Sequence, residues 1–130
     1  MDKNHTAKIK KIENIFWKVV FIAYIALILY LSLSKPLINY STFKGEDKIV
    51  HFISYFLGAD LFFTAFYKKT KKAYFIILLI SFALLPFITE WLQSFTYYRT
   101  YSKFDMLANY IGAVVGFLFF FLKHKAFSQE

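Results

Sequence analysis

Seven polar residues flank or interrupt the apolar segments of the chain: Asp47, His51, Glu90, Gln93, Arg99, Asp105 and Asn109. Polar groups are costly inside hydrocarbon and are rare there without a role. A histidine beside carboxylates can act in acid–base chemistry, whereas an arginine binds phosphate or carboxylate through two parallel hydrogen bonds. We predict that these side chains converge on one polar site, and the elements that position them follow from the rest of the sequence.

The first pair of polar residues shares a helix face. Asp47 and His51 are four residues apart and Tyr55 continues the same face, because residues four apart are neighbours on a helix. Asp47 alternatively caps the start of its helix, where aspartate is favoured. His51 is either an interface histidine or a proton donor and acceptor, since imidazole titrates near physiological pH.

The second pair, Glu90 and Gln93, is three residues apart and also shares a helix face. Pro86 precedes Glu90 by four residues, and its missing N–H group predicts a kink that opens room beside Glu90. The alternative role for both residues is hydrogen bonding between helices, which suits glutamine better than glutamate. A buried glutamate must be paired or protonated, so we favour a functional role for Glu90.

Arg99 is the only arginine in the chain, because the other basic residues are all lysine. Its planar guanidinium can hold a phosphate or carboxylate in a way that lysine cannot. The alternative is a structural salt bridge from Arg99 to Glu90 or Asp105, and both roles are compatible.

The third pair, Asp105 and Asn109, is followed on the same face by Gly112 and Gly116. Ser102 and Asp105 also form a capping-box pattern at the start of a helix, so Asp105 has a structural alternative. Asn109 lies too far into the helix to be a cap. The two glycines, four residues apart, predict a close approach of this helix to 49–67 or 73–95.

The composition predicts an all-α integral membrane protein with a bundle of four transmembrane helices. The 130 residues are 58% hydrophobic, 23% aromatic and only 18% charged. Four apolar runs approach the roughly 20 residues that cross a bilayer, at about 15–34, 49–67, 73–95 and 104–122. We expect a basic tail at 1–14, a bundle at 15–122 and a second tail at 123–130. The chain contains no cysteine, which excludes disulfides and thiolate chemistry.

The distribution of basic residues predicts that both termini are cytoplasmic. Ten lysines lie before residue 15, in 68–72 or after 122, against five basic residues in 35–48 and 99–103. The net charge of +8 therefore suits anionic headgroups rather than nucleic acid. In this orientation the polar residues gather at the outer face, with Glu90 about 8 Å below the boundary.

Three sequence blocks resemble a known family. Residues 47–56 are similar to the D-K-x-x-H-F-x-x-Y block of VanZ-like membrane proteins, and 90–95 are similar to their E-x-x-Q-x-F block. Arg99 with residues 105–112 resembles their R-x5-D-x3-N-x2-G block, although Tyr98 stands where glycine is usual. The resemblance implies a multi-pass protein of the bacterial inner membrane that contributes to low-level resistance against teicoplanin and related lipoglycopeptides.

These observations give one leading functional hypothesis. The outward polar site binds or modifies a cell-envelope lipid or another amphiphile, such as a lipid-linked cell-wall precursor or the glycopeptide itself. Arg99 would hold its anionic group. The expected ligand-binding residues are Asp47, His51, Tyr55, Glu90, Gln93, Arg99, Asp105 and Asn109. We assign no metal ligands and no cofactor under this hypothesis, and a homo-oligomer is compatible with it.

Two other classes of function stay open. In a small intramembrane enzyme, Glu90, His51 and Asp105 would be the catalytic candidates or would hold a divalent metal. In a proton-coupled transporter subunit, Asp60 would act as a titratable group inside the membrane. We expect instead that Asp60 forms a structural pair with Lys18 of the first segment.

Overall fold

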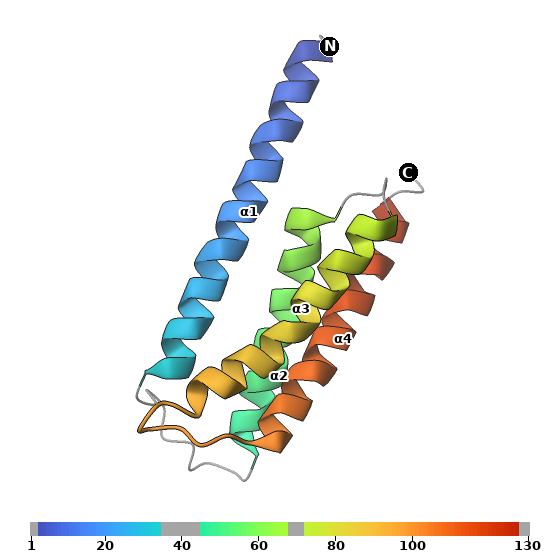
Figure 1. Cartoon of the computed structure of the whole chain (residues 1–130). Coiled ribbons are helices and arrows are strands. Elements are labelled where there is room, and N and C mark those ends of the chain that lie inside the picture. Colours follow the sequence, from blue (N-terminus) through green and yellow to red (C-terminus); the bar gives the residue numbers. More distant parts are fainter. Residues whose placement is uncertain (1–2, 35–44, 68–71, 128–130) are drawn as a thin grey trace.

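The protein is built from four helices, and the computed structural model describes residues 3–34, 45–67 and 72–127. They are α1 (Lys3–Leu33), α2 (Glu46–Phe66), α3 (Lys72–Gln93) and α4 (Lys103–Phe127). The helices run up and down, so that the first and last helices bring both termini to the same end of the bundle (Figure 1). The described residues contain no strand, which confirms the predicted all-α class. All four helices are long and apolar enough to cross a membrane.

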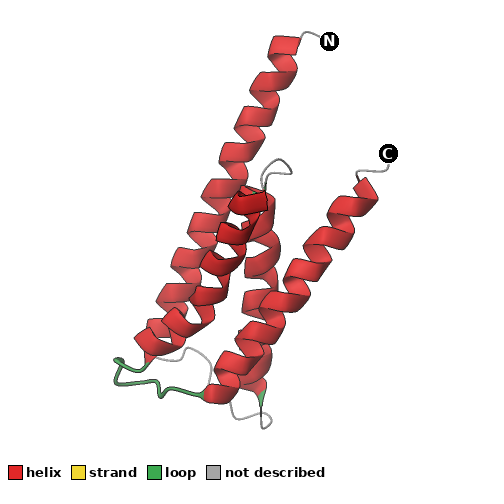
Figure 2. Ribbon diagram, turned by 45° about the vertical axis from the view of Figure 1, so that its right-hand side comes forward, coloured by secondary structure: helices red, strands yellow, loops and turns green. Residues whose placement is uncertain are grey.

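Two helices are longer than the apolar runs predicted. α1 begins at Lys3 rather than near residue 15, and α4 continues past residue 122 to Phe127. Lysine and alanine are good helix formers, so these basic ends remain helical although they are too polar for hydrocarbon. The 31 residues of α1 extend about 46 Å, against the ~30 Å of a bilayer core. The N-terminal part of α1 therefore projects beyond the other helices (Figures 1 and 2).

The closest packing in the bundle is between α2 and α4. Gly112 and Gly116 lie directly on the backbone carbonyls of Phe52 and Phe56, so closely that a side-chain Cβ at either position would overlap them. The prediction that the glycine pair allows close approach is confirmed, and the partner is α2. This contact fixes the register between the two helices that carry His51 and Asn109.

An aromatic cluster fills the bundle toward the end that holds the chain termini. Phe63 is 1% exposed, and its ring centroid lies 5.1 Å from that of Phe117, 5.7 Å from Phe120 and 6.2 Å from Phe82. Tilted and edge-to-face rings at such distances attract one another beyond simple contact. Exposed leucine and isoleucine side chains lie on the outer surface of every helix, which is compatible with a lipid environment.

The prediction that Asp60 pairs with Lys18 was wrong. Its carboxylate receives two hydrogen bonds from Lys123 Nζ of α4, at 2.7 and 2.9 Å. Lys18 instead lies over the ring of Phe66, 5.9 Å from its centroid. The reason is that α4 continues as a helix beyond residue 122, which carries Lys123 back against α2. The carboxylate is paired with a lysine of the predicted C-terminal tail rather than with the first helix.

The basic connections used to predict the orientation fall mainly in 35–44 and 68–71. These segments lie outside the described residues, as do residues 1–2 and 128–130.

Candidate functional site

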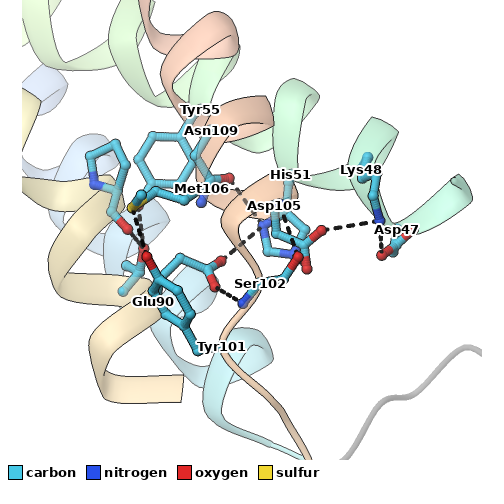
Figure 3. Close-up of polar contacts among 12 residues, drawn as sticks. Asp47, Lys48, His51, Tyr55, Glu90, Tyr101, Ser102, Asp105, Met106 and Asn109 are labelled. Atoms are coloured by element: carbon cyan, nitrogen blue, oxygen red, sulfur yellow. Dashed lines mark hydrogen bonds and ion pairs between the residues drawn. The ribbon is translucent and has the colours of Figure 1, made fainter. Parts of the chain in front are cut away.

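Three helices bring His51, Glu90 and Asp105 together at the end of the bundle opposite the termini (Figure 3). His51 Nδ1 lies 3.9 Å from Glu90 Oε1, and His51 Nε2 lies 3.8 Å from Asp105 Oδ2. Glu90 is fully buried, and the side chains of His51 and Asp105 are each 15% exposed. The predicted convergence of α2, α3 and α4 residues is therefore present in the fold.

Asn109 sets the orientation of the His51 ring. Its Oδ1 lies 3.0 Å from His51 Nδ1, so this hydrogen bond joins α4 to α2. An amide oxygen can only accept, so Nδ1 carries the proton and donates it to Asn109. In the neutral ring, Nε2 then presents a lone pair toward the carboxylate of Asp105, whose Oδ2 is 3.8 Å away. Asn109 is 1% exposed, in agreement with the expectation that it is not a helix cap.

Only one of the two hydrogen bonds of the predicted capping box forms at the start of α4. Ser102 caps the helix, because its Oγ accepts from the Asp105 N–H at 3.2 Å. In a complete capping box, the Asp105 carboxylate would accept from the Ser102 N–H. Glu90 Oε2 takes that donor instead, at 3.4 Å. The Asp105 side chain is consequently free to face His51 and Lys48, whose Nζ lies 3.3 Å from Asp105 Oδ1.

Asp47 lies at the edge of this group. Gly45, with a φ of 104°, is the N-cap of α2 and makes no side-chain cap bond, so Asp47 is not the cap. Asp47 Oδ2 accepts from Lys48 Nζ at 2.8 Å, and Lys48 also reaches Asp105. Asp47 thus reaches the site only through Lys48, and within the described residues no hydrogen bond or ion pair joins it to His51 despite their four-residue spacing.

Tyr55 and Thr89 form a hydrogen-bonded pair one turn deeper. Their hydroxyl oxygens are 2.6 Å apart, and Thr89 also donates toward the carbonyls of Leu85 and Pro86. Because Thr89 Oγ1 has one proton, it shares that proton between the two carbonyls and accepts from Tyr55. This pair connects α2 to α3 beside Pro86, which is buried inside the helix.

Arg99 and Gln93 border a cavity of about 310 Å³ between α1, α2, α3 and α4. His51, Tyr55, Thr89 and Asn109 also line it, and Ile28 and Leu31 of α1 form an apolar wall. Within the described residues, neither Glu90 nor Asp105 comes within 4.0 Å of an Arg99 nitrogen, so the salt bridge considered as an alternative role for Arg99 is absent. The guanidinium remains available to the cavity.

Among the described residues, four buried polar atoms of this group make no hydrogen bond. Two are acceptors, Glu90 Oε1 and Asp105 Oδ1, and two are donors, Arg99 Nε and Asn109 Nδ2. Of these four, Asp105 Oδ1 has an ion-pair contact with Lys48 Nζ, at 3.3 Å. Buried polar groups in folded proteins are nearly always satisfied, and an exception calls for a ligand, ion or water. Both kinds of unsatisfied atom occur side by side, which is suited to a ligand that carries negative charge together with a cation.

Sequence reasoning did not place Thr89 in the site and did not anticipate the contacts that Lys48 and Ser102 make there. Lys48 was counted only for orientation, and Ser102 only as a cap. Thr89 directly precedes Glu90 and lies three residues after Pro86, and this position in the sequence could have indicated that it lies near the site. The contribution of α1 had no signal, because its cavity residues are ordinary aliphatic side chains in an apolar run.

The fold and the site define a four-helix protein with membrane-compatible helices and a polar pocket at one end. No family model matches the chain. An uncharacterized protein of the fission yeast Schizosaccharomyces pombe is similar to it, with 32% identity over 80 residues. That match covers 62% of this chain and 49% of the relative, so the chain spans about half the length of the relative. No solved structure matches.

Proposed function

We propose that the chain is a multi-pass membrane protein whose polar cavity binds the anionic headgroup of a membrane amphiphile. The observation that carries the proposal is a pair of adjoining cavities of opposite character. The first, of about 310 Å³, has His51, Arg99 and Asn109 in its wall. The second, of about 100 Å³, is almost wholly apolar and lies between α1, α2 and α3.

The two cavities share part of their walls. Ile28, Ser54, Tyr55 and Thr89 line both of them. The apolar cavity continues past Tyr24 and Gly58 to Phe82, toward the middle of the bundle. A headgroup in the first cavity would thus lie next to a space that accepts the start of an acyl chain. A soluble anion needs only the first cavity, so the arrangement favours an amphiphile.

Arg99 supplies the charge complementarity. Its buried Nε has no protein partner, and a guanidinium binds phosphate or carboxylate through paired donors. Asn109 Nδ2 is a second unpaired donor in the same wall. The proposal keeps the ligand class implied by the sequence, an envelope lipid or lipid-linked precursor, with the site at the outer face. Placement in a bacterial inner membrane and teicoplanin resistance remain predictions from the VanZ-like blocks.

The acid–base alternative draws support from the approach of His51 to Glu90 and Asp105. Proton transfer requires such neighbours within reach of a substrate. The transport alternative has less support, because Asp60 is engaged by Lys123.

A binding measurement on the full chain in neutral detergent tests the proposal. The probes are dioctanoyl phosphatidic acid and the neutral dioctanoyl glycerol, followed by isothermal titration calorimetry. We expect the phosphate-bearing lipid to bind at least tenfold more tightly than the neutral lipid. Arg99→Gln should remove that preference, and Arg99→Lys should restore only part of it, because lysine lacks the planar fork.

Lys103→Gln is the matched control. It removes one positive charge near the same loop, from an exposed side chain outside the cavity wall. Its affinity for the phosphate lipid should stay within twofold of wild type. Equal binding of the two lipids, or equal losses in Arg99→Gln and Lys103→Gln, would show that general surface charge rather than the cavity attracts the ligand.

A further inference from the structure

We propose that His51, Glu90 and Asp105 form a binding site for one divalent metal ion of the kind that accepts imidazole and carboxylate ligands, Zn²⁺ or Mn²⁺. The proposal does not rest on amphiphile binding, because Glu90 and Asp105 lie outside the walls of both cavities. His51 alone belongs to the cation group and to the cavity.

The first argument is convergence from three helices. Each of the three residues offers a ligand atom, and these atoms all lie within 4.8 Å of one another. Ligands of one tetrahedral Zn²⁺ are about 3.4 Å apart, from bonds of roughly 2.1 Å. The closest His51–Asp105 pair, at 3.8 Å, must therefore close by about 0.4 Å on binding. Pairs that lie as far apart as the 4.8 Å limit must close by up to about 1.4 Å, so the three side chains have to rotate toward one another on binding.

The second argument is the unsatisfied charge of Glu90. Its side chain is fully buried, and Oε1 has no hydrogen-bond partner while it points at His51 (Figure 3). Among the described residues, no lysine or arginine nitrogen comes within 4.0 Å of this carboxylate. In the part of the chain that the structure describes, its only hydrogen bond is from the Ser102 N–H, at 3.4 Å. Asp105 adds a second carboxylate to the same space, so a bound cation would relieve both repulsion and incomplete hydrogen bonding.

The third argument is the tautomer of the His51 ring that the hydrogen bond to Asn109 selects. Because Nδ1–H is donated to Asn109 Oδ1, the neutral ring has the lone pair of Nε2 facing Asp105 Oδ2, 3.8 Å away. Two acceptors then oppose each other with no hydrogen between them. Metal-binding histidines commonly donate their second ring N–H to a carbonyl or carboxylate, which fixes the ring and the tautomer. Asn109 is the positioning residue that provides this bond.

The ligand set predicts which ions bind. Imidazole nitrogen suits Zn²⁺ and also Mn²⁺, whereas Mg²⁺ and Ca²⁺ prefer oxygen ligands alone. The general order of affinity places Zn²⁺ above Mn²⁺. We expect Zn²⁺ to displace Mn²⁺ from the site, and a tenfold excess of Mg²⁺ to leave Mn²⁺ bound.

The test uses the full chain in detergent without a histidine tag, stripped with a chelator and equilibrated with Mn²⁺. Elemental analysis after desalting should give one ion per chain, and the electron paramagnetic resonance spectrum of Mn²⁺ should report the bound form. Glu90→Gln and Asp105→Asn should weaken binding at least tenfold. Asn109→Ala should weaken it by roughly 10- to 100-fold, as expected for loss of the group that orients a ligand.

Glu13→Gln is the matched control, because it removes a carboxylate from an exposed position of α1 that is not among the three ligands. It should bind Mn²⁺ like the wild type. A wild-type stoichiometry below one ion in ten chains overturns the proposal, and so does an equal loss in Glu13→Gln and Asp105→Asn. If Glu90→Gln does not fold, the comparison of Asp105→Asn with Glu13→Gln still decides. Arg99→Gln should keep the metal, which separates this outcome from failure of amphiphile binding.

Discussion

At the scale of single residues, the site depends on which of several available partners each side chain takes. Glu90 accepts the Ser102 N–H that a capping box would give to Asp105, and this exchange leaves Asp105 facing His51. Asn109 determines which His51 nitrogen has a lone pair. A change in either partner would rearrange the chemistry of the group without altering the three residues that compose it.

The pair between Asp60 and Lys123 gives a residue-scale prediction. Lys123→Met leaves the Asp60 carboxylate without its two hydrogen bonds in a partly buried place. We expect the free energy of unfolding in detergent to fall by about 1–3 kcal/mol, the cost of leaving a buried polar group unsatisfied. Adding Asp60→Asn should recover most of that loss, because the unpaired charge is then gone. The measurement is thermal or denaturant unfolding followed by circular dichroism.

Lys18→Met is the control for the same charge loss on another helix. Lys18 lies over the Phe66 ring and not at Asp60, so its replacement should cost less than Lys123→Met. If the double variant with Asp60→Asn is no more stable than Lys123→Met alone, the carboxylate and the lysine do not act as a pair.

Helix periodicity explains why most of the site was predictable from sequence. The polar site residues stand out on otherwise apolar helices: His51, Glu90, Asp105 and Asn109. Polar side chains on such helices face the interior of the bundle, where they meet one another. The partners of these residues depend on rotamers and on the loop 94–102, for which no periodic pattern exists. For that reason the predicted Lys18–Asp60 pair is absent. Two structural alternatives, the Arg99 salt bridge and the Asp47 cap, are also absent from the described residues. The contacts of Lys48 and Ser102 with the site were not anticipated.

At the scale of elements, the α2–α4 contact positions the site. Gly112 and Gly116 let the backbone of α4 lie on the carbonyls of Phe52 and Phe56. Small residues have this role in membrane helices, where close packing rather than water expulsion holds helices together.

Gly112→Ala tests this contact. A Cβ at Gly112 would overlap the Phe52 backbone carbonyl, which cannot rotate away, so the helices must separate. We expect the free energy of unfolding to fall by about 1–3 kcal/mol, as for other overpacked positions. The His51–Asn109 hydrogen bond should weaken at the same time, so Mn²⁺ binding is a second readout.

Gly58→Ala is the matched control on α2. Its Cβ would meet only side-chain atoms, Tyr24 Cε1 at 3.3 Å and Phe82 Cζ at 3.8 Å. Both substitutions gain the same roughly 1 kcal/mol of helix propensity. Gly58→Ala should therefore be close to neutral, and equal destabilisation of the two variants would mean that the glycines are not specific contacts between backbones.

Hydropathy located all four helices but not their ends, and the reason is physical. A run of apolar residues reports contact with lipid or core, whereas a helix ends where backbone hydrogen bonding ends. Residues 3–14 are basic and yet contain no proline or glycine, so α1 simply continues through them. The same applies to residues 123–127 of α4.

At the scale of the whole molecule, an even number of helices places both termini at one end and the polar site at the other (Figure 1). The aromatic cluster and the Asp60–Lys123 pair occupy the half nearer the termini, and the cavities occupy the half nearer the site. Ligand access is therefore expected from one side only. Which side this is depends on the orientation in the membrane.

The absence of cysteine from the chain makes the orientation directly measurable, because any introduced cysteine is the only thiol. Thr100→Cys places a thiol in the exposed loop beside the site, and Lys8→Cys places one on the projecting part of α1. The excess of basic residues on the side of the termini predicts that this side is cytoplasmic. A membrane-impermeant maleimide should then label Thr100→Cys in intact cells and Lys8→Cys only after permeabilisation. The opposite pattern would turn the site toward the cytoplasm and exclude outer-leaflet ligands, while labelling of both in intact cells would contradict a single orientation.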